Sequence, residues 1–211
     1  MKEAITSKAA LTTKAIIADA LSNAMTYDAF KSLVKELSAT GGTSGPEQTD
    51  AYKEYTVLND QRMKRWDKTL KIADEKVDKI SRFKQKIVWL VITESWCGDA
   101  APTLPVMNKI TQLNPNIDLK IVMRNQYPEL MDLFLTDGKM SIPKLIMIDQ
   151  NTYEVLGSWG PLPGKAMMLA SEYKEQHGQL TAEFKEDLQV WFNADKGKHT
   201  LLDLMELLAL E

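Results

Sequence analysis

The chain has 211 residues, of which 44% are hydrophobic and 26% charged, and its formal net charge at pH 7 is −3. This composition is typical of a folded globular protein and excludes collagen-like, mucin-like and largely disordered chains. The small acidic excess gives no electrostatic reason to bind a polyanion, so we expect no nucleic-acid partner.

Metal sites, disulfides and membrane segments are not expected either. The single cysteine, Cys97, excludes an intramolecular disulfide and a multi-cysteine zinc site. The two histidines, His177 and His199, have no neighbouring ligand at metal-binding spacing, so we expect neither a metal nor another cofactor. Residues 1–8 lack the apolar stretch of a secretion signal, and the most apolar run, 87–93, is far shorter than the ~20 residues of a membrane span. We therefore expect a cytoplasmic protein without a membrane partner.

The first part of the chain has the pattern of amphipathic helices. Apolar residues recur at helical spacing from 14 to 37, which predicts one or two helices with Thr26 as a cap. Three glycines and a proline lie within 39–46 and predict a loop. The charged segment 50–83 has apolar residues every three to five positions and predicts a long helix whose charges form a solvated face.

These N-terminal helices have too few apolar residues for a core of their own. We therefore expect residues 1–83 to form a helical extension that packs on the domain formed by 84–211, or on a second copy of the chain in a homodimer. Such a cover either stabilises the fold or narrows access to a site beneath it. In the second case the Gly41–Pro46 loop is its natural hinge.

From residue 86 the pattern changes to short apolar segments that alternate with helices. The continuous apolar run at 87–93 predicts a strand buried on both faces. This order predicts an α/β fold, a central mixed sheet flanked by helices, with helical additions at both ends of the chain. Further strands are predicted at 118–123, 144–148 and 154–159, helices at about 100–110 and 128–135, and a helical tail at 164–211 interrupted at 196–198, with Thr200 as a cap.

Cys97 lies at the junction between the first predicted strand and the helix that follows it. Open α/β sheets place their chemistry at the carboxyl ends of strands. Amide N–H groups at the start of a helix point at a sulfur in this position and stabilise its thiolate. The position therefore predicts a nucleophile, and the alternative is a small buried apolar residue.

The segment around Cys97 resembles the active site of the thioredoxin superfamily. Trp96-Cys97-Gly98-Asp99-Ala100 is similar to the family's Trp-Cys-Gly-Pro-Cys. Three further landmarks stand in register: the helix-kinking Pro105, the Ser141-Ile142-Pro143-Lys144-Leu145 loop, which is similar to Gly-Ile-Pro-Thr-Leu, and Gly160. The chain resembles, more narrowly, a group of bacterial thioredoxin-like proteins that combine a helical N-terminal extension with a Trp-Cys-Gly-Asp motif.

The resemblance implies a thioredoxin-like fold and the residues of its active site. Cys97 is the implied catalytic residue, and Pro143 is implied to be cis and to lie beside its sulfur. Ile142 is implied to offer its backbone to an extended substrate. The residues implied to surround the cysteine or contact the substrate are Trp96, Gly98, Asp99, Ala100, Ile142 and Pro143.

The departures from the family pattern limit the chemistry. Ala100 replaces the resolving cysteine, and Val91 replaces the buried aspartate that serves it, which together exclude a dithiol reductase. Asp99 replaces the motif proline, and the sign of its effect on the thiol pKa stays open. A negative charge beside the thiol raises that pKa, whereas a carboxylate that caps the helix is engaged with amide donors. A one-cysteine peroxiredoxin is not favoured, because Glu94 stands where that class needs Thr or Ser and Thr93 is one position off.

Two functions are consistent with this pattern. In the first, Cys97 exchanges with a protein or low-molecular-weight disulfide, and an external thiol such as glutathione resolves the mixed disulfide. In the second, a redox-inactive thioredoxin fold binds a partner protein. Dependence of partner capture on the sulfur of Cys97 distinguishes them.

Overall fold

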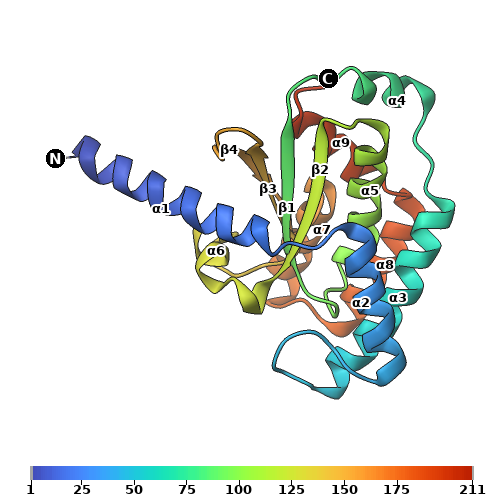
Figure 1. Ribbon diagram of the computed structural model, residues 1–211. Coiled ribbons are helices and arrows are strands. Elements are labelled where there is room, and N and C mark those ends of the chain that lie inside the picture. Colours follow the sequence, from blue (N-terminus) through green and yellow to red (C-terminus); the bar gives the residue numbers. More distant parts are fainter. Residues whose placement is uncertain (1, 211) are drawn as a thin grey trace.

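A computed structural model describes the backbone of residues 2–210 and the side chains from residue 12 to 210. The chain begins with α1 (Lys2–Ser22), which projects from the body of the molecule, and α2 (Tyr27–Thr40) (Figure 1). The predicted cap is confirmed, since the hydroxyl of Thr26 accepts a 3.2 Å hydrogen bond from the N–H of Ala29. Within the described residues, no helix is both long and apolar enough to cross a membrane.

The prediction of one long helix from 50 to 83 is wrong. The chain forms α3 (Asp50–Thr69) and a short α4 (Asp74–Ser81), separated by extended backbone from Leu70 to Ala73. Leu70 and Ile72 in this break pack against the main hydrophobic core. The apolar contacts of the break therefore outweigh the helical preference of the charged segment.

The central sheet has four strands in the order β2-β1-β3-β4. Their bounds are β1 (Ile87–Thr93), β2 (Ile117–Met123), β3 (Lys144–Asp149) and β4 (Val155–Trp159). β1 pairs with β2 in parallel and with β3 antiparallel, and β4 pairs antiparallel with β3. All seven residues of β1 are buried, as its continuous apolar run predicts. The predicted α/β fold with a mixed sheet is confirmed.

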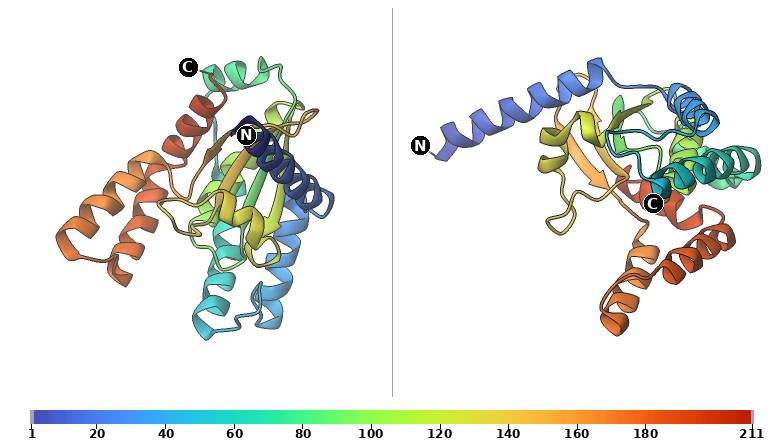
Figure 2. Two further views of the ribbon diagram at one scale, coloured as in Figure 1. Left: turned by 90° about the vertical axis from the view of Figure 1, so that its left-hand side faces the viewer. Right: turned by 90° about the horizontal axis from the view of Figure 1, so that it is seen from below.

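Helices cover both faces of this sheet (Figure 2). α5 (Ala100–Leu113) and α9 (Lys198–Leu207) contact each other on one face, where α5 also contacts β2 and α9 contacts β4. α6 (Pro128–Leu133) lies on the other face and contacts α1. The outer edge of β2 is covered by Met25, whose N–H and carbonyl each bond to Ile121 at 2.8 Å.

The C-terminal region is helical but differs in detail from the prediction. It forms α7 (Gly164–His177) and α8 (Ala182–Asp195) before α9, with an additional break at 178–181. Thr200 is not the cap of α9, because that helix begins after Gly197 and the buried Thr200 hydroxyl lies inside it without a partner. α7 and α8 share a small second core with Trp66 of α3.

The N-terminal helices contribute to the same hydrophobic core as the sheet. Phe30, Val34 and Met63 are buried in one cluster with Trp89 of β1 and Leu104 of α5. α3 packs along α5, and α2 packs on both α3 and β2. The start of α5, where the cysteine motif lies, is therefore enclosed by the N-terminal region on one side and the sheet on the other.

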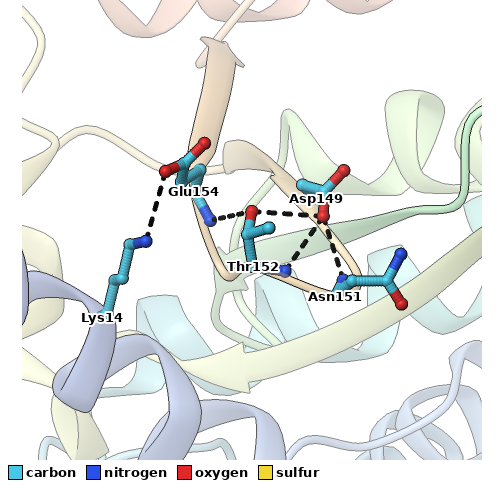
Figure 3. A network of polar contacts seen from close by, with 5 residues as sticks. All are labelled: Lys14, Asp149, Asn151, Thr152 and Glu154. Atoms are coloured by element: carbon cyan, nitrogen blue, oxygen red, sulfur yellow. Dashed lines mark hydrogen bonds and ion pairs between the residues drawn. The ribbon is translucent and has the colours of Figure 1, made fainter.

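The turn between β3 and β4 is held by its own polar groups (Figure 3). Asp149 accepts hydrogen bonds of 3.0 Å from the N–H groups of Asn151 and Thr152, and these bonds lower the pKa of its carboxyl. Glu154 at the end of the turn forms an exposed ion pair of 3.3 Å with Lys14 of α1. This pair joins the sheet to the base of the projecting helix.

Candidate active site

The cysteine motif and the Ile142–Pro143 loop meet at the end of β1. Cys97 is only 5% exposed, and its thiol donates a 3.3 Å hydrogen bond to the carbonyl oxygen of Ile142, 45 residues further along the chain. The Ile142–Pro143 peptide bond is cis. The structure thus brings together the two segments that the resemblance places in one site, and Gly98, Asp99 and Ala100 lead from the sulfur into α5.

Three donors surround the sulfur. The N–H groups of Asp99 and Ala100 and the hydroxyl of Thr93 are placed to stabilise a thiolate and lower the pKa of Cys97. The hydroxyl of Thr93 is fully buried and has no other hydrogen-bond partner. The two N–H donors expected at the start of the helix are therefore present, and the hydroxyl of Thr93, the last residue of β1, is a third donor.

Burial nevertheless has the larger effect on this thiol. Loss of water around the sulfur, followed by the nearby charge of Asp99, raises the pKa of Cys97 to about 12. Burial thus opposes the thiolate stabilisation that the strand-to-helix position of Cys97 favours. The positions of the strand and the helix can be predicted from the sequence, but the extent to which neighbouring residues bury the sulfur cannot.

Asp99 occupies the capping position of α5 without acting as a cap. Its side chain makes no hydrogen bond to the N–H groups at the start of the helix. Its negative charge instead raises the pKa of Cys97. Burial raises the pKa of Asp99 to about 6, against the opposing effects of Lys185 and Arg62. The carboxyl charge of Asp99 therefore raises the pKa of Cys97, whereas its backbone N–H lowers it.

Replacing Asp99 with asparagine should stabilise the protein at neutral pH. A carboxyl with a raised folded-state pKa favours the folded state when it is protonated, so this contribution is present below about pH 4 and is lost as the pH rises through about 6. After discounting for partial exposure, Asp99→Asn should raise the free energy of unfolding at pH 7.5 by about 1–2 kcal/mol and have little effect at pH 4. Urea unfolding at both pH values measures this difference, and an equal effect at both contradicts the assignment.

Trp96 is held between a second aromatic ring and a cation. The ring of Tyr52 on α3 stacks on it at a centroid distance of 4.2 Å with 4° between the planes. The guanidinium of Arg124, in the short 3-10 helix η1 (Arg124–Gln126), lies 5.0 Å from the centroid of the same ring. The tryptophan next to the cysteine is therefore fixed by residues that the motif does not include.

A buried carboxyl anchors the residues immediately before the motif. Glu94 is fully buried; it accepts a short hydrogen bond from the hydroxyl of Ser44 and a 2.9 Å bond from the N–H of Asn125. Ser44 also accepts a 2.8 Å bond from the N–H of Ser95. Glu94 thus connects the turn after β1 to the N-terminal loop and to η1.

The hydroxyl of Ser95 extends this network to α3. It accepts a 2.8 Å bond from the N–H of Ser44 and lies within hydrogen-bond distance of the hydroxyls of Thr43 and Thr56. Asn59 donates to the carbonyl of Ser95 at 2.8 Å. The interpretation of the Gly41–Pro46 loop as a hinge is therefore wrong, because Thr43 and Ser44 are buried and bonded to the motif turn.

The side of the site formed by α3 is not among the residues predicted from the sequence, although the sequence carries a signal for it. Tyr52, Tyr55, Asn59 and Arg62 recur at intervals of three or four residues and form one stripe of polar and aromatic side chains. Tyr55 and Arg62 lie over Gly98, where an added Cβ would meet the tyrosine ring at 3.7 Å and Arg62 Nη1 at 3.9 Å. A helical stripe with these residue types indicates a polar contact surface, whereas the charges around it suggested only solvent exposure.

Comparison with known proteins places this chain in a family. A family model described as thioredoxin matches residues 45–174, more than half of the chain. A protein of unknown function from Pseudomonas aeruginosa is 18% identical, with a TM-score of 0.57 over 72% of this chain and 83% of that one. An HIV epitope-scaffold crystal structure is 17% identical, with a TM-score of 0.56 over 88% of this chain and 98% of that one. No curated protein gives a match. With its cysteine motif after β1 and its proline loop before β3, the chain belongs to the thioredoxin family.

Proposed function

We propose that this protein carries out thiol–disulfide exchange through Cys97 as its single nucleophile. The observation that carries the proposal is the 3.3 Å contact between the Cys97 sulfur and the carbonyl of Ile142. It sets the sulfur against the loop whose backbone lies beside an extended substrate in this family. Ala100 stands where a resolving cysteine would be, so the second step needs a thiol from outside the chain.

The reaction has two balanced steps. Cys97 loses its proton to solvent and attacks one sulfur of a disulfide, whose S–S bond breaks as a mixed disulfide with Cys97 forms and the other sulfur leaves as a thiol. An external thiolate then attacks the mixed disulfide, forms a new disulfide with the bound half and releases Cys97 as a thiolate, which takes up a proton from solvent. The donors from Asp99, Ala100 and Thr93 stabilise the thiolate that attacks and is later released.

The raised pKa of Cys97 also supports a second candidate function. A buried, protonated sulfur is a weak nucleophile, and this favours a thioredoxin fold that binds a partner without thiol chemistry. In that case the proline loop and the surrounding aromatic residues serve as a binding surface.

Intact-mass measurement on the reduced full-length chain distinguishes these functions. Incubation with 2-hydroxyethyl disulfide at pH 8.5 should add one half-disulfide to the folded protein, and a second thiol such as glutathione should remove it. Cys97→Ser should give no adduct. If the folded wild-type chain forms no adduct while the urea-unfolded chain does, the sulfur is structural and the binding function replaces redox exchange.

A further inference from the structure

Three cationic side chains from distant parts of the chain converge on the cysteine motif. Arg62 of α3 lies over Gly98, and Arg124 of η1 lies over the ring of Trp96. Lys185 of α8 acts on the carboxyl of Asp99 from the C-terminal region. The three sides of the motif that these elements cover therefore each present a positive charge, although the whole chain has a net charge of −3.

None of these three cations forms a direct ion pair within 4 Å of a described residue, although Arg62 and Lys185 act on Asp99 from a longer distance. The ion pairs formed by described side chains, residues 12–210, include none of Arg62, Arg124 and Lys185. The Nη1 atom of Arg62 is buried and has no hydrogen-bond partner. A buried donor without an acceptor is unfavourable, and a ligand oxygen that accepts its hydrogen bond would remove this penalty.

The carboxyls nearby neutralise only part of the cluster. Glu94 is turned into the protein, where Ser44 and the backbone of Asn125 bond to both of its oxygens. Among the described residues, Asp99 is the one acid known to act on these cations, and its single negative charge at neutral pH offsets only part of their three positive charges. The surroundings of the sulfur therefore have an excess of positive charge, and beside Gly98 they include a guanidinium nitrogen without a hydrogen-bond partner in the described part of the chain.

We propose that the disulfide exchanged at Cys97 is anionic, with carboxylates close to its sulfur atoms that bind to Arg62, Arg124 and Lys185. This inference rests on the proposed thiol–disulfide exchange and adds the charge class of its substrate. A low-molecular-weight thiol with carboxylates and an acidic protein segment share this chemistry. In both, the carboxylates orient the disulfide over the sulfur before the S–S bond breaks, and the leaving sulfur departs as a thiol.

Three small disulfides that differ in charge test the proposal. They are 3,3′-dithiodipropionate, 2-hydroxyethyl disulfide and cystamine, which are dianionic, neutral and dicationic at pH 7.5. The rate of adduct formation at Cys97, followed by intact mass, is divided by the rate of each probe with free 2-mercaptoethanol, a thiol with no other charged group. This removes intrinsic differences in disulfide reactivity. We expect the dianion to react about tenfold faster than the neutral probe, the dication to be slowest, and the differences to shrink in 0.5 M salt.

Variants assign the effect to the cluster. Arg62→Gln, Arg124→Gln and Lys185→Gln should each reduce the dianion-to-neutral ratio severalfold. Lys84→Gln, a change at an exposed residue before the opposite end of β1, should leave that ratio unchanged. Circular dichroism checks that each variant is folded, and the salt series on the wild-type chain tests the charge effect without any substitution.

The outcomes separate this inference from the proposed function. Equal normalised rates for the three probes, or a faster neutral or cationic probe, overturn the charge proposal and leave exchange at Cys97 intact. No adduct with any probe overturns the proposed function itself. A comparison of glutathione disulfide with a disulfide-linked acidic peptide then shows whether the anionic disulfide is a small molecule or part of a protein. Equal reaction rates, each divided by the number of carboxylates, support a small thiol. A much faster reaction of the peptide supports a protein partner.

Discussion

Replacement of Gly160 by alanine should destabilise the protein by about 3 kcal/mol or more. Gly160 follows β4 and has a φ of +107°, a conformation that side-chain-bearing residues rarely adopt. A Cβ at this position would overlap the carbonyl oxygen of Pro143 and lie 3.3 Å from its carbonyl carbon. Since both contacts are with backbone, relief requires movement of the loop beside Cys97, so exchange at the sulfur should also slow.

Gly138→Ala is the matched control for this change. Gly138 also has a positive φ, +72°, but an added Cβ there would have no neighbour within 4 Å. Its substitution should cost about 1 kcal/mol from backbone conformation alone. Urea unfolding of both variants measures the difference. Similar losses in the free energy of unfolding would show that the close approach of Gly160 to Pro143 contributes little to the cost of the substitution.

Replacement of Glu94 by alanine should cost about 3 kcal/mol. The change leaves the hydroxyl of Ser44 and the N–H of Asn125 without their acceptor in a region closed to water, and it creates a cavity. Because Glu94 connects the motif turn to the N-terminal loop, the variant should also loosen the ring stack on Trp96, which near-UV circular dichroism reports.

An exposed acid provides the comparison for Glu94. The side chain of Glu154 is 63% exposed and pairs with Lys14 at 3.3 Å (Figure 3). Glu154→Ala should cost less than about 0.5 kcal/mol. Comparable losses for Glu94→Ala and Glu154→Ala would mean that the buried network around Ser44 contributes little to stability.

Much of the fold could be predicted from local patterns in the sequence. The unbroken apolar run at 87–93 is long enough for a strand and too short for most helices, and it forms β1. The Thr26 cap is equally local, because its partner, the N–H of Ala29, is three residues away. The two halves of the site, the motif at Trp96–Ala100 and the loop at Ile142–Pro143, could also be predicted, because the family resemblance implies that they lie in contact.

The features that could not be predicted depend on contacts between residues far apart in sequence. The loop containing Ser44 has the composition of a flexible segment, and only its partners 50 residues away make it a buried anchor. The end of α3 at Thr69 depends on the packing of Leu70 against the core. The raised pKa of Cys97 depends on how deeply several elements bury one sulfur, a property that no single segment carries.

The bonds between Ser44 and the motif turn also impose an order on folding during synthesis. The ribosome makes the N-terminal helices and the Ser44 loop before it makes β1, so for about 50 residues of elongation their polar groups face water. The network closes when Glu94 and Ser95 emerge, and the sulfur of Cys97 reaches Ile142 only after 45 more residues. Because of chain order alone, the sulfur of Cys97 is accessible in the nascent protein before the segments that bury it are complete.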